Sequence, residues 1–257
     1  MAELDVNVLD CKVHIRRAGA GDPLLFLHGA QGLPGWDDAL AALATNFDVI
    51  APDLPGFGLS GNSELVDDVP QLAYFMLDLL DTLGVGKVHV VGQCAGGWLA
   101  MEMALRSSAR IKSLNLVNSA GIRIKGIPRG DMFICPPDEL LTLLFAGDCG
   151  PAWQEQWSTS SEITDIYERN LASAAKYVWE PRLASLTLDR WLHRIDAPTQ
   201  IIWGDANRVI PMAYAKTLGE LIKGARVTTL RDCGHLAHYE QPQALAAAVT
   251  GFIQEIV

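Results

Sequence analysis

The sequence predicts an α/β fold, with a mostly parallel central sheet covered by helices on both faces. Short apolar runs alternate with amphipathic segments through the first 120 residues, which is typical of strands that alternate with helices. The same alternation resumes near residue 199 and continues toward the end of the chain. At 257 residues, 49% hydrophobic and 19% charged, the chain suits one large domain or a domain with an insertion.

The strands are predicted from short runs rich in Val, Ile, Leu and Phe, each of which ends at a loop with Gly, Pro, Asp or Asn. The first is an edge strand, and the later ones read as buried strands such as PLLFL, FDVIA, KVHVV and TQIIW. In chain order the predicted strands are Cys11–Arg17, Pro23–Leu27, Phe47–Ala51, Lys87–Val91, Ser113–Val117, Thr199–Trp203 and Arg226–Leu230.

The helices are predicted where apolar residues recur every three or four positions between two of these runs. A glycine near the end of the second helix, Gly84, is a typical helix stop. The predicted helices are Trp36–Ala44, Leu72–Leu83, Trp98–Arg106, a segment that begins near Ala213, and Pro242–Ile256.

The alternation is interrupted between residues 121 and 188. This segment has no clear apolar strand, contains several helical stretches and holds five prolines. It also carries a group of large aromatic residues: Trp153, Trp157, Tyr167, Tyr177 and Trp179. We therefore expect a core domain formed by residues 1–120 and 189–257, and a helical lid or cap formed by residues 121–188, with the aromatic residues lining an apolar pocket.

Composition narrows the classes of partner. A formal net charge of −10 argues against nucleic-acid binding, and no apolar run approaches the ~20 residues of a membrane span. The acidic N-terminal segment lacks the apolar stretch of a secretory signal, so a cytoplasmic location is expected. The five cysteines are widely spaced and form no CxxC pair, which predicts free thiols, no metal site and no redox site. The sequence predicts no cofactor and does not indicate an oligomeric state.

The strongest chemical signal is the segment Gly92-Gln93-Cys94-Ala95-Gly96 between a predicted strand and a predicted helix. A nucleophile elbow needs this context, with small residues on both sides of the reactive residue because the turn is tight. The first turn of a helix favours an anion, so the pKa of the Cys94 thiol is expected to be lowered from its usual ~8.5 toward neutrality. The alternative is that Cys94 is an inert buried thiol.

Five motifs stand in the order found in the α/β-hydrolase superfamily: LHGAQG, APDLPGFGLSG, VGQCAGGW, IIWGDANRVIP and DCGHLAHYEQP. The chain resembles bacterial carboxylesterases and carbon–carbon bond hydrolases of aromatic ring-cleavage products, over its whole length except the variable insertion. The resemblance implies a nucleophile at Cys94, where most relatives carry serine, and a catalytic histidine at His235 in Cys233-Gly234-His235. His238 is the weaker rival to His235.

The position of the usual triad aspartate is read from Gly204-Asp205-Ala206-Asn207, and it aligns with Asn207 rather than with Asp205. The pair of replacements is chemically consistent. A cysteine can ionise before it attacks, so a neutral amide suffices to orient the imidazole, as in Cys-His-Asn proteases. On that basis Asn207→Asp is expected to change activity little. The competing explanation is that both replacements are inactivating substitutions, engineered or natural.

The resemblance also implies an oxyanion hole formed by the backbone N–H groups of Ala30 and Ala95, worth ~3 kcal/mol each. Gln31 is a candidate for an additional side-chain donor to the substrate, and Phe57 is a candidate for contact with the pocket.

The leading hypothesis is a cofactor-independent hydrolase of a small ester, thioester, lactone or activated carbon–carbon bond, acting through an acyl-cysteine. Transfer of the acyl group to another acceptor is the second possibility. The third is a retired hydrolase that binds a small molecule. The substrate itself is not encoded in any motif.

Overall fold

The computed structural model describes residues 1–256 and contains one eight-stranded sheet. The strands lie in the order β1-β2-β4-β3-β5-β6-β7-β8. The first two pairings, β1 with β2 and β2 with β4, are antiparallel, and all the others are parallel. The predicted fold class is therefore confirmed. Among the described residues no helix is long and apolar enough to span a membrane.

The strands are β1 (Ala2–Val8), β2 (Cys11–Ala18), β3 (Pro23–Leu27), β4 (Asp48–Pro52), β5 (Val88–Gln93), β6 (Ile111–Val117), β7 (Thr199–Gly204) and β8 (Arg226–Leu230). The helices are α1 (Asp38–Leu43), α2 (Val69–Thr82), α3 (Ala95–Arg106), α4 (Pro137–Leu144), α5 (Gly150–Gln156), α6 (Ser161–Val178), α7 (Ala213–Leu221), α8 (Ala237–Glu240) and α9 (Pro242–Ile256). Three 3₁₀ turns cover Ser108–Arg110, Leu188–Arg190 and Leu192–Arg194.

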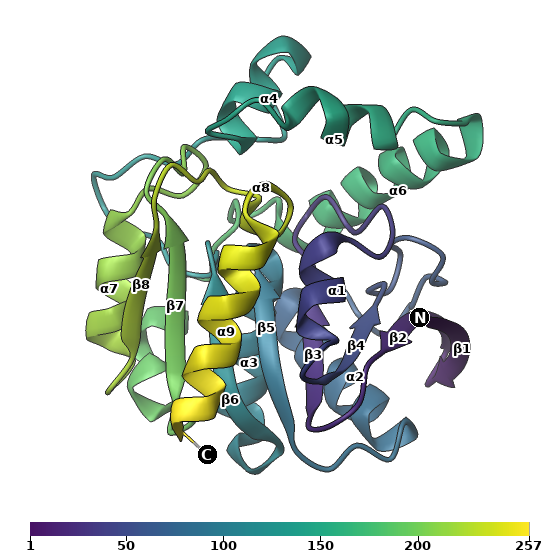
Figure 1. Ribbon diagram of the computed structural model, residues 1–257, viewed down its shortest axis with the longest axis vertical. Coiled ribbons are helices and arrows are strands. Elements are labelled where there is room, and N and C mark those ends of the chain that lie inside the picture. Colours follow the sequence, from purple (N-terminus) through teal and green to yellow (C-terminus); the bar gives the residue numbers. More distant parts are fainter. Residues whose placement is uncertain (257) are drawn as a thin grey trace.

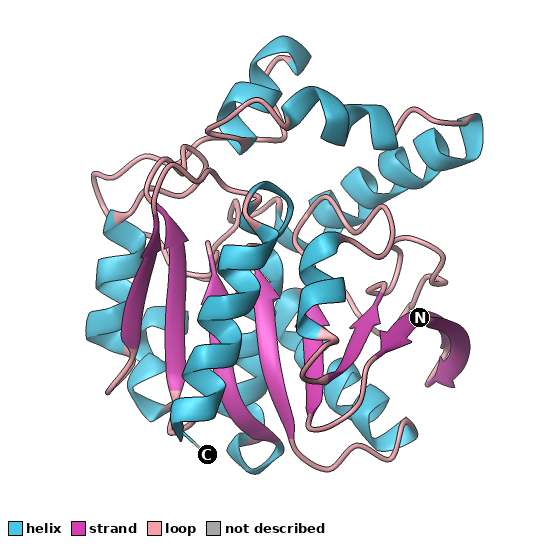
Figure 2. Cartoon of the chain, viewed as in Figure 1, coloured by secondary structure: helices cyan, strands magenta, loops and turns pink. Residues whose placement is uncertain are grey.

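Helices cover both faces of the sheet (Figures 1 and 2). Helices α1 and α9 pack together on one face, over the apolar side chains of β3 and β4. Helices α2, α3 and α7 cover the other face and share the larger hydrophobic core with β5, β6 and the insertion. The central strands β3, β5 and β7 are buried along almost their whole length, which explains why they read as continuous apolar runs.

Strand β1 was absent from the sequence prediction. Its seven residues, AELDVNV, alternate between exposed and half-buried side chains along the edge of the sheet. An edge strand with both faces partly in water has no buried run to detect, so its pairing with β2 is the only signal that defines it. Helix α3 also begins earlier than predicted, at Ala95, because the helix starts directly at the elbow.

Residues 121–188 contain helices α4, α5 and α6, which lie above the carboxyl ends of the parallel strands (Figure 1). The segment departs from the sheet after β6 and returns before β7, in agreement with the predicted interruption of the alternation. Its longest helix, α6, is capped by Ser160, whose side chain accepts a hydrogen bond from the backbone N–H of Ile163.

Candidate active site

The reactive turn lies between β5 and α3, and Cys94 occupies it with φ 52° and ψ −115°. This left-handed conformation strains a residue that has a side chain, and such strain is common at functional turns. The flanking glycines have no room for a side chain. A Cβ on Gly92 would lie 2.4 Å from the carbonyl oxygen of Gly96, and a Cβ on Gly96 would lie 2.1 Å from that of Leu27. The elbow geometry therefore requires both glycines.

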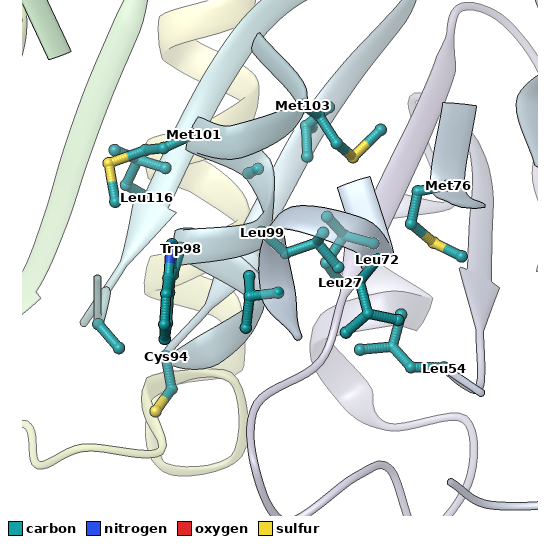
Figure 3. Packing of buried hydrophobic residues seen from close by; sticks show 14 of the residues in the cluster. Leu27, Leu54, Leu72, Met76, Cys94, Trp98, Leu99, Met101, Met103 and Leu116 are labelled. Carbon is teal, nitrogen blue, oxygen red and sulfur yellow. The ribbon is translucent and has the colours of Figure 1, made fainter. Parts of the chain in front are cut away.

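The sulfur of Cys94 lies near two backbone donors. The backbone N–H groups of Ala95 and Ala30 both lower the thiol pKa, as does the charge of Arg129. Burial is the larger effect, however: Cys94 has no exposed surface, and burial raises its pKa to about 12. Figure 3 shows its side chain at the end of α3, beneath Trp98, with the sulfur pointing away from the hydrophobic cluster. The predicted lowering of the Cys94 pKa is therefore wrong, because the first-turn and amide effects are smaller than the cost of desolvation.

His235 follows β8 and is also fully buried. Its backbone is held from two sides: the N–H donates to the Leu144 carbonyl at 2.7 Å, and the carbonyl accepts from Gln93 Nε2 and Asn118 Nδ2. Neither ring nitrogen hydrogen-bonds to any of the described residues. Burial, with a smaller effect of His238, lowers the pKa of His235 to about 3. The resting site therefore holds a neutral thiol and a neutral imidazole, and not the thiolate–imidazolium pair expected from the sequence.

Asn207 is buried, whereas Asp205 is exposed, so the aligned residue is also the one inside the fold. The loop that carries Asn207 contacts the segment Cys233-Gly234-His235, which we call the histidine turn. The backbone N–H of Ala206 donates to the Cys233 carbonyl at 3.0 Å. The side-chain oxygen of Asn207 accepts from the backbone N–H groups of Val209 and Ile210, at 3.0 Å each. Its buried Nδ2 has no partner among residues 1–256.

The orientation of the Asn207 amide has a chemical consequence. Only an oxygen can accept from two backbone N–H groups, so Nδ2 is the atom of the amide left without a partner. Asn207 can therefore offer His235 hydrogen-bond donors and no acceptor. An aspartate with the same backbone contacts would offer a carboxylate oxygen instead, which is the group that favours the Nδ1–H tautomer in a triad.

Three of the remaining predicted residues line a small apolar cavity of about 20 Å³ beside the elbow. Phe57 lines it, together with Ala30 and Ala95, and its ring centroid is 4.8 Å from that of His28. Gln31 is 4% exposed, and its Nε2 donates to the Met132 sulfur at 2.9 Å. Its Oε1 is buried without a partner among the described residues. Gln31 thus lies beside the predicted oxyanion loop, with one of its two amide N–H donors engaged by Met132.

His28 and His238 have different surroundings. His28 bridges two loops, because its Nδ1 is 2.8 Å from the Gly29 carbonyl and its Nε2 accepts from the Leu54 backbone N–H at 3.1 Å. His238 makes no such bridge: its Nε2 is 4.0 Å from an Asp37 oxygen, and its Nδ1 has no partner among residues 1–256.

The insertion contacts the histidine turn directly, which no sequence motif indicated. Glu240 connects them: one carboxylate oxygen accepts from the backbone N–H groups of Ala146 and Gly147, at 2.9 and 2.6 Å. The other oxygen accepts from the N–H of Gly234 at 2.6 Å. With the bond from His235 to Leu144, the end of α4 and the turn after β8 form one hydrogen-bonded unit.

A second attachment joins helix α6 to the core. Asn170 is fully buried, donates from Nδ2 to the Gln31 carbonyl at 3.0 Å and accepts from the Gly58 N–H at 2.8 Å. Ser173 and Tyr177 donate to the carbonyls of the same core loop, Gly56 and Pro55. Helix α6 is therefore fixed to the loops that carry Gln31 and Phe57.

The aromatic residues of the insertion are arranged differently from the prediction. Trp153, Trp157 and Tyr167 contact one another, with ring centroids 5.0–6.4 Å apart. Tyr177 lines the small cavity, and Trp179 is 42% exposed. Most of the aromatic surface thus forms the interior of the insertion and does not line the cavity.

Comparisons with known proteins agree with this architecture. The profile of the family described as "Alpha/beta hydrolase family" matches residues 24–248. The chain is 25% identical over 268 residues to 2-hydroxy-6-oxo-2,4-heptadienoate hydrolase of Pseudomonas putida, covering 94% of this chain and 92% of that protein. It is 26% identical over 273 residues to 2-hydroxymuconate semialdehyde hydrolase of a Pseudomonas species, covering 95% and 91%.

Solved structures show the same fold. A meta-cleavage product hydrolase from Pseudomonas fluorescens superposes with a TM-score of 0.80 at 24% identity, covering 99% of this chain and 98% of that one. A membrane phospholipase A gives a TM-score of 0.80 at 23% identity, covering 99% and 86%. The family profile spans far more than half of the sequence, and the chain therefore belongs to the alpha/beta hydrolase family.

Proposed function

We propose that this chain is a cofactor-independent hydrolase of a small ester, thioester, lactone or activated carbon–carbon bond, with Cys94 as the nucleophile. The observation that carries the proposal is the convergence of two backbone N–H groups, from Ala30 and Ala95, on a strained elbow cysteine. An inert thiol needs neither the strained turn nor the two donors, and donors so placed stabilise a developing oxyanion. The names of the relatives, which include carbon–carbon bond hydrolases, are consistent with this reaction class.

In this reaction the sulfur of Cys94 bonds to the acyl carbon, and the carbonyl electron pair moves to the oxygen held by Ala30 and Ala95. The thiol proton passes to Nε2 of His235 and then to the leaving group as the scissile bond breaks. Water adds to the resulting thioester with His235 again as base, which releases the acid and restores the thiol. Because the resting pair is neutral, the proton must move during attack and not before it.

His235 can accept that proton only when its neutral ring carries hydrogen on Nδ1. Among residues 1–256 no acceptor holds that hydrogen, and Asn207 can present only donors. We therefore expect Asn207→Asp to raise kcat/KM at least ~10-fold, since the carboxylate favours the required tautomer. This revises the expectation from the sequence that the substitution changes little.

The lack of an acceptor for the Nδ1 hydrogen of His235 also favours a second candidate, a catalytically inactive hydrolase that binds a small molecule. The two candidates are separated by steady-state kinetics on p-nitrophenyl acetate with the parent, Cys94→Ser, Asn207→Asp and the double variant. The cysteine hydrolase predicts turnover by the parent, an acetyl adduct on Cys94 by intact mass, and loss of turnover in Cys94→Ser. Cys94→Ala is the control for background hydrolysis.

An inactive parent, together with a gain of several orders of magnitude in the double variant, would identify a disabled serine hydrolase and overturn the cysteine mechanism. Acyl transfer is distinguished by its products. Addition of hydroxylamine diverts the acetyl-cysteine to the hydroxamate in either case, but a transferase leaves the thioester resistant to water, so the adduct accumulates without release of acetate.

The insertion, residues 121–188, is proposed to act as a lid. Support comes from the complete burial of Cys94 and His235 and from a cavity too small for an acyl substrate, so that access requires movement. The proposal predicts that a disulfide between α6 and the core blocks turnover reversibly.

A further inference from the structure

A second pocket lies on the other side of the histidine turn, and the proposed reaction leaves it unused. Its volume is about 520 Å³, within the range of small-molecule sites. Three parts of the chain line it: the loop from Pro34 to Asp38, the helix α8 through His238 and Tyr239, and the insertion through Gln156, Thr159 and Ile163. Cys94 does not line it.

Two polar side chains that line the pocket, Asp37 and His238, each carry one buried atom without a hydrogen-bond partner among the described residues. Asp37 caps helix α1 with one oxygen, which accepts from the Leu40 N–H at 2.8 Å, but its other oxygen has no partner. Nδ1 of His238 also has none. The side chains are only 10% and 8% exposed, and the Asp37 oxygen is 4.0 Å from His238 Nε2, which is too far for a hydrogen bond. Unpaired buried polar atoms are costly, and a ligand in this pocket can supply their partner.

The charge of the lining favours a cation. Its two carboxylates, Asp37 and Asp38, face no Lys or Arg among the lining residues. Trp36 offers an aromatic surface at the same place, and such surfaces attract ammonium groups. We propose that this pocket binds a compact organic ammonium ion, held by Asp37 and Asp38 and packed against Trp36.

The pKa values of Asp37 and His238 are consistent with a cation-binding pocket. Burial raises the pKa of Asp37 to about 7, and burial lowers that of His238 to about 4, so their facing side chains do not supply each other's countercharge. A bound ammonium ion favours the carboxylate form of Asp37. Its binding should therefore tighten as the pH rises from 6 to 8. Of the other titratable groups that line the pocket, His238 stays neutral over this range, and Tyr239 titrates well above it because burial raises its pKa. Asp38 is an exposed carboxylate.

The test measures binding of butylammonium by calorimetry, with 1-butanol as the neutral isostere. Both are added to the full-length Cys94→Ala variant, so the result does not depend on whether Cys94 is a nucleophile. We expect butylammonium to bind at least 10-fold more tightly than 1-butanol, with affinity that rises between pH 6 and 8. Asp37→Asn is the decisive variant, because asparagine caps a helix as well as aspartate does and the fold is preserved. It should weaken butylammonium binding at least 10-fold and remove the pH dependence.

Asp38→Asn should weaken binding by a smaller factor, and Trp36→Leu should reduce the preference for the cation. Asp189→Asn, remote from the pocket, is the matched control for a general loss of negative charge. Equal affinity for 1-butanol and butylammonium, or unchanged binding in Asp37→Asn with its helix content intact, would overturn the proposal. A loss equal to that of Asp37→Asn in the remote control would overturn it as well.

Discussion

The elbow and the helical insertion are held in place in different ways. At the elbow, backbone atoms meet backbone atoms: glycines at 92 and 96 leave no room for a Cβ, and the two candidate oxyanion donors are main-chain N–H groups. The insertion is attached to the core by main-chain bonds such as the one from His235 to Leu144, and also by polar side chains, above all Glu240 and Asn170. A glycine crowded by backbone atoms tolerates no side chain, whereas a side-chain contact can be lost singly. The comparison therefore predicts a steep hierarchy of mutational effects.

The largest effect is expected at the elbow. Gly96→Ala would place a Cβ 2.1 Å from the Leu27 carbonyl oxygen and 2.7 Å from that of His28. We expect more than ~4 kcal/mol of destabilisation, enough to prevent recovery of folded protein. The matched control is Gly251→Ala in helix α9, where nothing lies within 4 Å of the added carbon. That change should stabilise the protein by ~0.5–1 kcal/mol. Urea unfolding measures both, and a folded Gly96→Ala variant would contradict the hierarchy.

The next effect is expected at Glu240. Glutamine keeps one acceptor oxygen but presents an NH₂ group to one set of backbone donors, so Glu240→Gln cannot satisfy Gly234 together with Ala146 and Gly147. We expect a loss of ~1–3 kcal/mol in unfolding free energy, as for hydrogen bonds to a charged group. Because the turn carries His235, kcat should fall while KM changes little. Glu255→Gln, on the exposed end of α9, is the control, since its carboxylate pairs only with Arg226 at the surface.

Asn170 gives an effect of similar size on the other side of the insertion. Asn170→Ala leaves the Gly58 N–H and the Gln31 carbonyl without their partner, at a cost of ~1–3 kcal/mol. Hydrogen exchange should increase in α6 and in the loop around Phe57, and remain unchanged at α9. Exchange that rises equally in both helices would indicate global destabilisation and not the release of one attachment.

The smallest effect concerns pH. With the pKa of Cys94 raised to about 12 and that of His235 lowered to about 3, neither group changes protonation between pH 5 and 9. Acylation should therefore show no bell-shaped dependence over this range. For the same reason iodoacetamide at neutral pH should label Cys135 and Cys149, which are partly exposed, before Cys94. A titration near pH 8 in kcat/KM, or preferential labelling of Cys94, would show that the thiol ionises more readily than its burial allows.

The free energy of unfolding also depends on pH. The folded-state pKa of His235 and of His238 is depressed, so each contributes stability that is present above pH ~6.5 and is lost as the pH falls toward 3 to 4. His238→Gln should reduce the loss of unfolding free energy that occurs as the pH falls over this range.

Much of the core was predictable, and the reasons can be stated residue by residue. Strands β3, β5 and β7 are continuous apolar runs because both of their faces are covered, and the elbow glycines follow from backbone crowding. The motif aligns Asn207, and not Asp205, with the usual triad aspartate, and of the two only Asn207 is buried. The ionisation of Cys94 could not be predicted, because it depends on how completely the folded chain buries the thiol. The Leu144 carbonyl and Glu240 were missed because a contact of a main-chain group with a residue distant in sequence leaves no pattern in residue types.

The bond from the His235 N–H to the Leu144 carbonyl has a kinetic consequence. Any displacement of α4 from the core must break this 2.7 Å contact, and with it one of the supports of the imidazole. If the proposed lid opens by displacing α4, substrate entry and alignment of His235 occur in different conformations. The apparent association rate should then fall below the diffusion limit in proportion to the fraction of time that this contact is broken.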